Sequence, residues 1–134
     1  MWSVFNEERN EMSTPMLQAI KIQEHAAELG FDWPTVGPVM DKVREELDEI
    51  KAELDADIVK QKLVEEEVGD LLFAVLNLVR HVKVHPEQAL ISANNKFMNR
   101  FQWVETAVQQ GSGNFKDYSL DELEAFWQQA KQKR

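Results

Sequence analysis

Apolar residues recur every three to four positions along most of this chain, and no useful stretch alternates with the two-residue period of a β-strand. The five glycines and four prolines fall mainly at the boundaries between these segments. The pattern predicts an all-α fold, arranged as an antiparallel bundle of four to five helices. The expected helices span residues 15–29, 38–54, 57–84, 87–109 and 120–132.

Capping residues support several of these boundaries. Ser13 or Thr14 can cap the first helix, and Gly30 suits the left-handed residue that ends it. Ser119 and Glu122 have the spacing of a capping box at the start of the last helix. Residues 1–12 are expected to form an N-terminal tail or linker remnant, so the folded domain is expected to cover residues 13–134.

The segment 71–82 carries the strongest packing signal, because it is apolar nearly all round. A helix of this kind lies in the middle of a bundle or is shared between subunits. One chain of 134 residues has too little other structure to cover both sides of it. We therefore expect a homodimer, although the surface pattern of the helices does not distinguish a dimer from a tetramer.

Acidic residues outnumber basic ones, since 24 Asp and Glu against 15 Lys and Arg give a formal net charge of −9. This balance argues against binding to nucleic-acid polymers or to an anionic membrane surface, because both require a basic protein surface. The longest apolar run, 71–76, is too short to span a bilayer. The absence of cysteine excludes disulfides and thiolate metal sites, and it is consistent with a cytoplasmic location.

Four acids on two neighbouring predicted helices lie close to apolar stripes. Glu67 and Asp70 are three residues apart and share a helix face with apolar neighbours. On the preceding helix, Glu46 flanks the predicted apolar stripe, and Glu49 lies at its edge. That stripe consists of Val39, Val43, Leu47, Ile50 and Leu54.

Carboxylates brought together near an apolar core repel one another, and a bound cation is the simplest relief. Ligands that are all oxygen suit Mg²⁺, or Mn²⁺ as an alternative. Mg²⁺ usually shares its coordination shell with phosphate oxygens, so an acidic protein can still bind a polyphosphate through the metal. The other interpretation is that these acidic runs are solvated helix faces.

Two basic residues on the 87–109 helix are candidates for phosphate binding. Lys96 and Arg100 are four residues apart, share a face, and suit phosphate oxygens. They could equally be surface cations or salt-bridge partners. Trp127 could stack on a base or pack against the same helix.

Other polar residues receive less specific predictions. Asn77 is either a partner behind the metal ligands or one end of a buried interhelical hydrogen bond, which we favour. His25 and His81 are expected on helix surfaces and His85 at a helix end, because their spacing is not that of metal ligands. The chain shows neither a Gly-rich phosphate loop nor a Ser-centred nucleophile motif.

Two motifs carry a family resemblance. The segments Lys42-x-x-Glu45-Glu46-x-x-Glu49 and Glu67-x-x-Asp70-Leu71-Leu72-Phe73 resemble those of the MazG-type nucleoside triphosphate pyrophosphohydrolases. The acidic pattern alone is shared with dimeric dUTPases and phosphoribosyl-ATP pyrophosphohydrolases, whereas the flanking segments point to MazG, most closely to its C-terminal domain. Those flanking segments are residues 21–23, 30–34, 77–81, 89–90 and 93–101.

The resemblance implies an all-α intertwined homodimer that hydrolyses nucleoside triphosphates to nucleoside monophosphates and pyrophosphate with Mg²⁺. By position it implies roles for seven residues. These are metal ligation for Glu46, Glu49, Glu67 and Asp70, triphosphate contacts for Lys96 and Arg100, and base stacking for Trp127.

The resulting hypothesis is hydrolysis by a metal-activated water, which Glu66 or Glu45 orients. Two alternatives stay open. One is a narrower dUTP or dCTP pyrophosphatase, since base preference depends on a pocket shape that the sequence does not show. The other is a non-catalytic dimeric helical interaction module that uses its acids as a solvated face or a docking surface.

Overall fold

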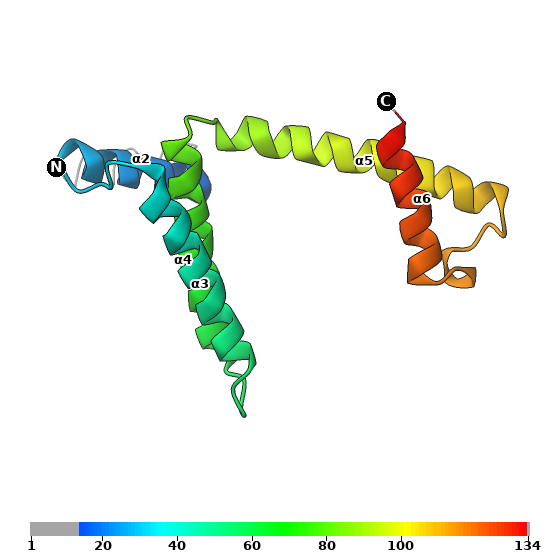
Figure 1. Cartoon of the computed structure of the whole chain (residues 1–134), viewed down its shortest axis with the longest axis horizontal. Helices are drawn as coiled ribbons and strands as arrows, with labels where there is room; N and C mark the ends of the chain where they lie inside the picture. The colour runs from blue at the N-terminus through cyan, green and yellow to red at the C-terminus, as the bar shows by residue number, and fades with distance from the viewer. Residues whose placement is uncertain (1–13, 134) are drawn as a thin grey trace. The chain divides into compact units, whose positions relative to one another are not determined.

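The computed structural model describes residues 14–133, so the predicted tail at residues 1–12 lies outside the described residues, as does Ser13. Every regular element within the described range is helical, as the sequence predicts (Figure 1). The elements, in chain order, are α2 (Pro15–Glu28), α3 (Val36–Leu54), α4 (Gln61–His81), α5 (Pro86–Gln110), the 3-10 turn η1 (Phe115–Asp117) and α6 (Leu120–Gln132).

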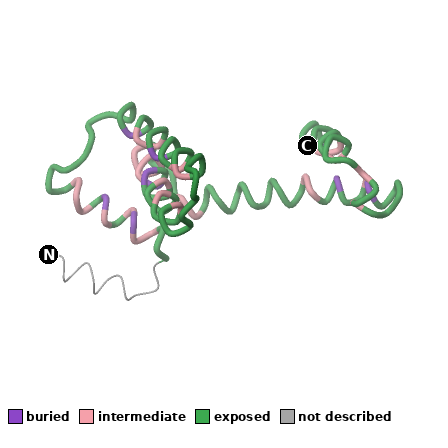
Figure 2. Tube along the Cα trace, turned by 90° about the horizontal axis from the view of Figure 1, so that it is seen from below, coloured by how far each residue is buried: buried purple, intermediate pink, exposed green. Residues whose placement is uncertain are grey.

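The chain divides into two compact units, the first ending at Pro86 and the second beginning at Glu87. The first unit holds α2, α3 and α4, and the second holds α5, η1 and α6. Figure 2 shows buried and intermediate residues along the faces where the helices of the first unit meet. The buried apolar residues are Ala19, Val39, Ala74 and Leu76 in the first unit, and Val104, Val108 and Ala130 in the second.

Within the first unit, α3 and α4 form an antiparallel hairpin joined by residues 55–60, and α2 packs against α4 (Figure 1). A short connection between two helices normally places them side by side in opposite directions. The hairpin therefore confirms the antiparallel packing that the sequence predicts for these helices.

The observed helix boundaries differ from the predicted ones by up to four residues. Helix α3 begins at Val36 rather than at 38, because Pro38 falls in the first turn, where the N–H that proline lacks has no helical partner. Helix α4 begins at Gln61 rather than at 57, since the preceding aspartates and β-branched residues are weak helix formers. It ends at His81 rather than at 84, because Lys83 adopts a left-handed φ of 60°.

The predicted caps are present at both ends of the described range. The Thr14 hydroxyl accepts a hydrogen bond from the Leu17 N–H at 3.3 Å. Ser119 and Glu122 form the expected capping box, since each side chain accepts a hydrogen bond from the other residue's N–H. Gly30 takes the predicted left-handed conformation after α2, with a φ of +94°.

The packing face of α3 is rotated away from the predicted stripe. Leu47 and Leu54 are 56% and 53% exposed, whereas Glu46 is only 6% exposed. Helix α4 is not buried all round either, since Leu72 is 57% exposed and Val75 is 36% exposed. The predicted burial of Leu47 and Leu54 is wrong for the single chain, because two packed helices bury only one narrow face of each other. The exposed side of α4 agrees with the expectation that one chain cannot cover both sides of this helix.

The helices within residues 14–133 were also compared with the requirements of a membrane span. None of them is long and apolar enough to cross a membrane.

Aromatic rings connect the three elements of the second unit. The ring centroids of Phe97 and Phe101 on α5 lie 5.9 Å apart, and Phe101 stacks on Phe115 of η1 at 5.8 Å. Trp127 of α6 lies 5.0 Å from Phe97. This cluster explains how α6 is held on α5 although few aliphatic residues are buried between them.

Candidate metal centre

Acidic side chains of α3 and α4 converge on the hairpin of the first unit. Carboxylate oxygens of Glu46, Glu67 and Asp70 lie within 4.8 Å of one another, and so do those of Glu45, Glu46 and Glu49. Glu46 belongs to both groups and joins them. The four acids predicted as metal ligands are therefore brought to one place from two helices.

Helix geometry explains this convergence. Glu46 and Glu49 are neighbours on one turn of α3, and Glu67 and Asp70 are neighbours on one turn of α4. The two turns are about equally far from the 55–60 connection, so the antiparallel hairpin places them side by side.

Two of these carboxylates have buried oxygen atoms that nothing in the described chain satisfies. Oε2 of Glu46 and Oε2 of Glu67 are buried and have no hydrogen-bond partner within residues 14–133. Lys42 balances only one edge of the cluster, with its Nζ 3.2 Å from Oε1 of Glu46 and 3.2 Å from Oε1 of Glu45. These ion pairs raise the pKa of Lys42. Buried polar atoms normally have a hydrogen-bond partner or a bound ion. Each of these two oxygens is therefore expected to bind a group that the described chain does not supply.

The crowding raises the pKa of Glu67 from 4.5 to about 7. The largest cause is a hydrogen bond with the Glu49 carboxyl group, followed by loss of solvation. The negative charges of Glu49, Asp70 and Glu46 add to the effect. The site thus holds more negative charge than its surroundings offset at neutral pH.

The donor set fits a hard divalent cation. Both groups contain only Asp and Glu, and carboxylate oxygens are the ligands that such cations prefer. A cation would give Oε2 of Glu46 and Oε2 of Glu67 the partner that they lack. It would also relieve the repulsion that raises the pKa of Glu67.

The two acids predicted to orient water lie in different surroundings. Glu45 belongs to the second carboxylate group and is held by Lys42. Glu66 is exposed on α4 and belongs to neither group. Glu45 therefore lies within the carboxylate cluster, whereas Glu66 lies outside it.

The predicted substrate-binding residues lie in the second unit. Lys96 and Arg100 share a face of α5, with Lys96 exposed and Arg100 partly buried. Trp127 packs on Phe97, which confirms the interpretation that it packs against this helix. The expectation that Lys96, Arg100 and Trp127 contact a nucleotide remains a prediction.

The sequence pattern does not reveal an ion-pair network that joins the α2–α3 loop to the end of α4. Arg80 donates two hydrogen bonds to the Asp32 carboxylate, at 3.0 Å and 2.8 Å, and Nε2 of His81 lies 2.9 Å from Oδ1 of Asp32. The hydrogen bond from Arg80 is the main reason that the pKa of Asp32 is held well below its ordinary range. The predicted surface position of His81 is therefore wrong, since its side chain is only 11% exposed.

Asn77 also belongs to this network. Its Oδ1 accepts hydrogen bonds from Nε and Nη2 of Arg80, at 3.2 Å and 2.7 Å. Both residues lie on α4, so the interhelical hydrogen bond that we favour for Asn77 is wrong. The i, i+3 spacing of the two residues makes this bond possible, but Asp32, 48 residues away, is what fixes Arg80 in place.

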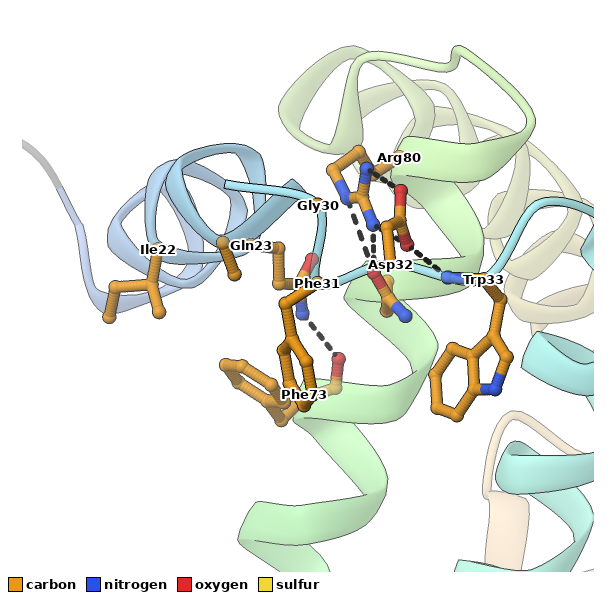
Figure 3. Close-up of a pocket in the computed structure, with 10 residues that line it drawn as sticks. Ile22, Gln23, Gly30, Phe31, Asp32, Trp33, Phe73 and Arg80 are labelled. Carbon is orange, nitrogen blue, oxygen red and sulfur yellow. Dashed lines mark hydrogen bonds and ion pairs between the residues drawn. The ribbon is translucent and has the colours of Figure 1, made fainter. Parts of the chain in front are cut away.

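A pocket of about 450 Å³ lies beside the network, between α2, the loop after it and α4 (Figure 3). This volume is within the range of small-molecule sites. Its walls are mainly apolar, and Gln23 and Asn77 add amide groups. The apolar walls include Ile22, Phe31, Trp33 and Phe73.

No protein-family model matches the chain. The nucleoside triphosphate pyrophosphohydrolase of Escherichia coli (strain K12) is 47% identical to it over 116 residues, which are 87% of this chain and 44% of that protein. Most of this chain is homologous to MazG-type nucleoside triphosphate pyrophosphohydrolases. MazG of Thermotoga maritima, named a nucleoside triphosphate pyrophosphohydrolase/pyrophosphatase, is 36% identical over 124 residues, which are 92% of this chain and 47% of that protein. The chain thus spans less than half the length of either MazG-type relative.

Proposed function

We propose that this chain hydrolyses nucleoside triphosphates to nucleoside monophosphates and pyrophosphate in a reaction that depends on Mg²⁺. The observation that carries the proposal is the convergence of Glu46, Glu67 and Asp70, with two buried oxygens that lack a partner within the described chain. The names of the E. coli and T. maritima relatives support the same reaction.

In this proposal Glu46, Glu49, Glu67 and Asp70 hold the metal. The bound cation would supply Lewis acidity to the phosphate oxygens and would lower the pKa of a water molecule. Glu45 is proposed to accept a hydrogen bond from the attacking water, with Glu66 as the more exposed candidate. The remaining contribution of the protein is positioning and fixed charge.

Lys96 and Arg100 are proposed to contact the triphosphate. Their shared face on α5 presents an ammonium group and a guanidinium group, and the guanidinium can bind two phosphate oxygens at once. Trp127 is proposed to stack on the base, as the sequence resemblance implies. These assignments rest on the sequence resemblance and on the placement of the residues.

We propose that the working form is a homodimer. Helix α4 exposes Leu72, Val75 and Val68, which are 57%, 36% and 38% accessible, next to the acidic turn. Large apolar side chains grouped on one helix are typical of an interface. The absence of cysteine from the sequence fits a reducing, cytoplasmic setting for such a dimer.

The direct test of the reaction is a product analysis. The protein is incubated with each ribonucleoside and deoxyribonucleoside triphosphate, with and without Mg²⁺, and the products are separated. We expect nucleoside monophosphate and pyrophosphate in equal amounts and only when Mg²⁺ is present. Nucleoside diphosphate with inorganic phosphate, or no product from any nucleotide, would contradict the proposal. Turnover of dUTP or dCTP alone would narrow it to the pyrimidine-specific alternative.

A further inference from the structure

We propose that Asp32, Arg80 and Asn77 form a latch that holds the loop of residues 30–34 against α4, and that release of Asp32 opens the pocket beside it. Arg80 and Asn77 are the fixed half of the latch on α4, and Asp32 is the half that moves with the loop. The latch goes beyond the proposed hydrolysis and does not depend on it, because it rests on contacts within the first unit alone.

The loop supplies one wall of the pocket. Gly30, Phe31, Asp32 and Trp33 all line the cavity, together with residues of α2 and α4 (Figure 3). Movement of Asp32 and Trp33 away from α4 opens that wall and exposes the apolar interior to solvent. The position of the loop therefore decides whether the pocket is enclosed.

The closed position of the loop depends mainly on one carboxylate. Within residues 14–133, the hydrogen bonds and ion pairs that join this loop to α4 all end on Asp32, and their other ends are Arg80 and His81. Phe31 is 84% exposed and Trp33 is 42% exposed, so apolar packing adds little to the attachment. Loss of the Asp32 contacts thus frees the loop from α4.

The end of the loop next to α2 is anchored separately. The Gly30 N–H donates to the Ala27 carbonyl and the Phe31 N–H to the Ala26 carbonyl, both at 2.9 Å, which is the hydrogen-bond pattern of a Schellman motif. These bonds join the loop to α2 alone, so they persist when Asp32 leaves α4. The loop then turns about this anchored end.

The half of the latch on α4 is formed before the loop closes. Oδ1 of Asn77 accepts hydrogen bonds from Nε and Nη2 of Arg80, at 3.2 Å and 2.7 Å, and both residues lie on α4. Nη1 and Nη2 of the guanidinium also donate to the two oxygens of Asp32, at 3.0 Å and 2.8 Å. Because Asn77 already orients the guanidinium, less conformational entropy is lost when Asp32 binds.

The exposure of the charged groups allows the latch to open. The side chains of Arg80 and Asp32 are 16% and 25% exposed, so neither charge is fully removed from water. Parting such a pair lets water solvate both groups, whereas parting a fully buried pair leaves two charges without solvation. The bidentate geometry nevertheless favours the closed state over an ordinary surface ion pair.

The first test measures the rigidity of the loop by ¹⁵N relaxation of backbone amides. In the wild type, Asp32 and Trp33 should have order parameters of about 0.85, as in the helices. Arg80→Met keeps the apolar stem and removes the guanidinium, so these values should fall below about 0.6 while the interiors of α3 and α4 stay rigid. Arg44→Met is the matched control, because Arg44 pairs with Asp41 at 3.0 Å on the same helix, and the loop should stay rigid in it.

Two further variants test each half of the latch. Asp32→Asn removes the charge at nearly constant size and should loosen the loop in the same way as Arg80→Met. Asn77→Ala should lower the order parameters of Asp32 and Trp33 to values between those of the wild type and Arg80→Met. A loop that stays rigid in Arg80→Met and Asp32→Asn, or an equal loss of order throughout α3 and α4, would overturn the proposal.

The second test measures access to the pocket. The sequence contains no cysteine, so the thiol of Ala26→Cys, on the pocket wall, reports exposure without background. A thiol reagent should modify it about tenfold faster when Arg80→Met is also present, and at an unchanged rate when Arg44→Met is present instead. Equal rates in both backgrounds would show that the latch does not control the pocket.

Discussion

At the scale of single residues, the proposed metal centre consists of carboxylates whose charge the surrounding chain does not neutralise. Glu67 is the clearest case, because its pKa is raised to about 7 by a hydrogen bond with Glu49, by lost solvation and by neighbouring charges. We propose that such a residue serves metal binding rather than stability. Removing its charge should therefore affect function and folding in opposite directions.

Glu67→Gln should stabilise the metal-free protein at pH 8. The folded-state pKa lies above the ordinary value of 4.5, so the folded protein binds more protons than the unfolded chain between these values. The stability of the wild type must then fall as the pH rises from about 4.5 through about 7. Thermal melts in the presence of a chelator should show a higher Tm for Glu67→Gln at pH 8 and little difference near pH 4.5. A lower Tm at pH 8 would contradict the assignment.

Asp32→Asn should have the opposite pH dependence. The pKa of Asp32 is lowered in the folded state, chiefly by its hydrogen bond with Arg80, so its contribution to stability is present above its ordinary value of 3.8. That contribution is lost progressively as the pH falls from this value through the lowered folded-state pKa. Urea unfolding at pH 7 should show a loss of about 1–2 kcal/mol in the variant, with the gap beginning to narrow only below about pH 4 and narrowing further toward about pH 2. A gap that stays constant over this range would show that the ion pair is not its cause.

At the scale of helices, the sequence predicts the elements well and their orientation poorly. The spacing of apolar residues and the caps at Thr14 and Ser119 are local features, so the five helices could be predicted. The rotation of α3 could not, because Glu46 and Leu47 are adjacent and either can face a neighbouring helix. Asp32 and Arg80 are 48 residues apart, so their ion pair does not appear in the periodic pattern of the sequence and could not be predicted from it.

The end of α4 offers a test of backbone strain. Lys83 has a φ of 60°, and its N–H donates to the Arg80 carbonyl at 3.1 Å while the Val84 N–H donates to the Val79 carbonyl at 3.2 Å. This is again a Schellman pattern, at a position that glycine normally occupies. Lys83→Gly should raise the free energy of unfolding by about 1 kcal/mol, measured by urea denaturation. A destabilised variant would mean that the lysine side chain contributes more than its backbone strain costs.

At the scale of the whole molecule, little apolar surface is buried by each unit alone. Most buried apolar residues are small, namely alanine and valine, whereas several leucines of α3 and α4 are more than half exposed. The sequence indicates this imbalance, since residues 71–82 are apolar nearly all round. It does not show which of these residues would meet a second chain in the proposed dimer.

Sedimentation should therefore show a species of about twice 15.6 kDa at micromolar concentration. Leu72→Glu places a charge on the exposed face of α4 and should shift the protein toward the monomer. Leu120→Glu, at an 80% exposed residue at the start of α6, serves as the control and should leave the mass unchanged. A wild-type monomer, or a dimer that tolerates Leu72→Glu, would exclude this face as the interface.

The central claim is that carboxylates of α3 and α4 hold a divalent cation required for hydrolysis. It is tested most directly by the Mg²⁺-dependent rate of nucleoside monophosphate formation in Glu67→Gln and in Glu65→Gln, a neighbour outside both carboxylate groups. Glu67→Gln should lower turnover by about 100-fold or more with the fold intact, while Glu65→Gln should remain close to the wild type. Near-normal Mg²⁺-dependent turnover in Glu67→Gln would contradict the account.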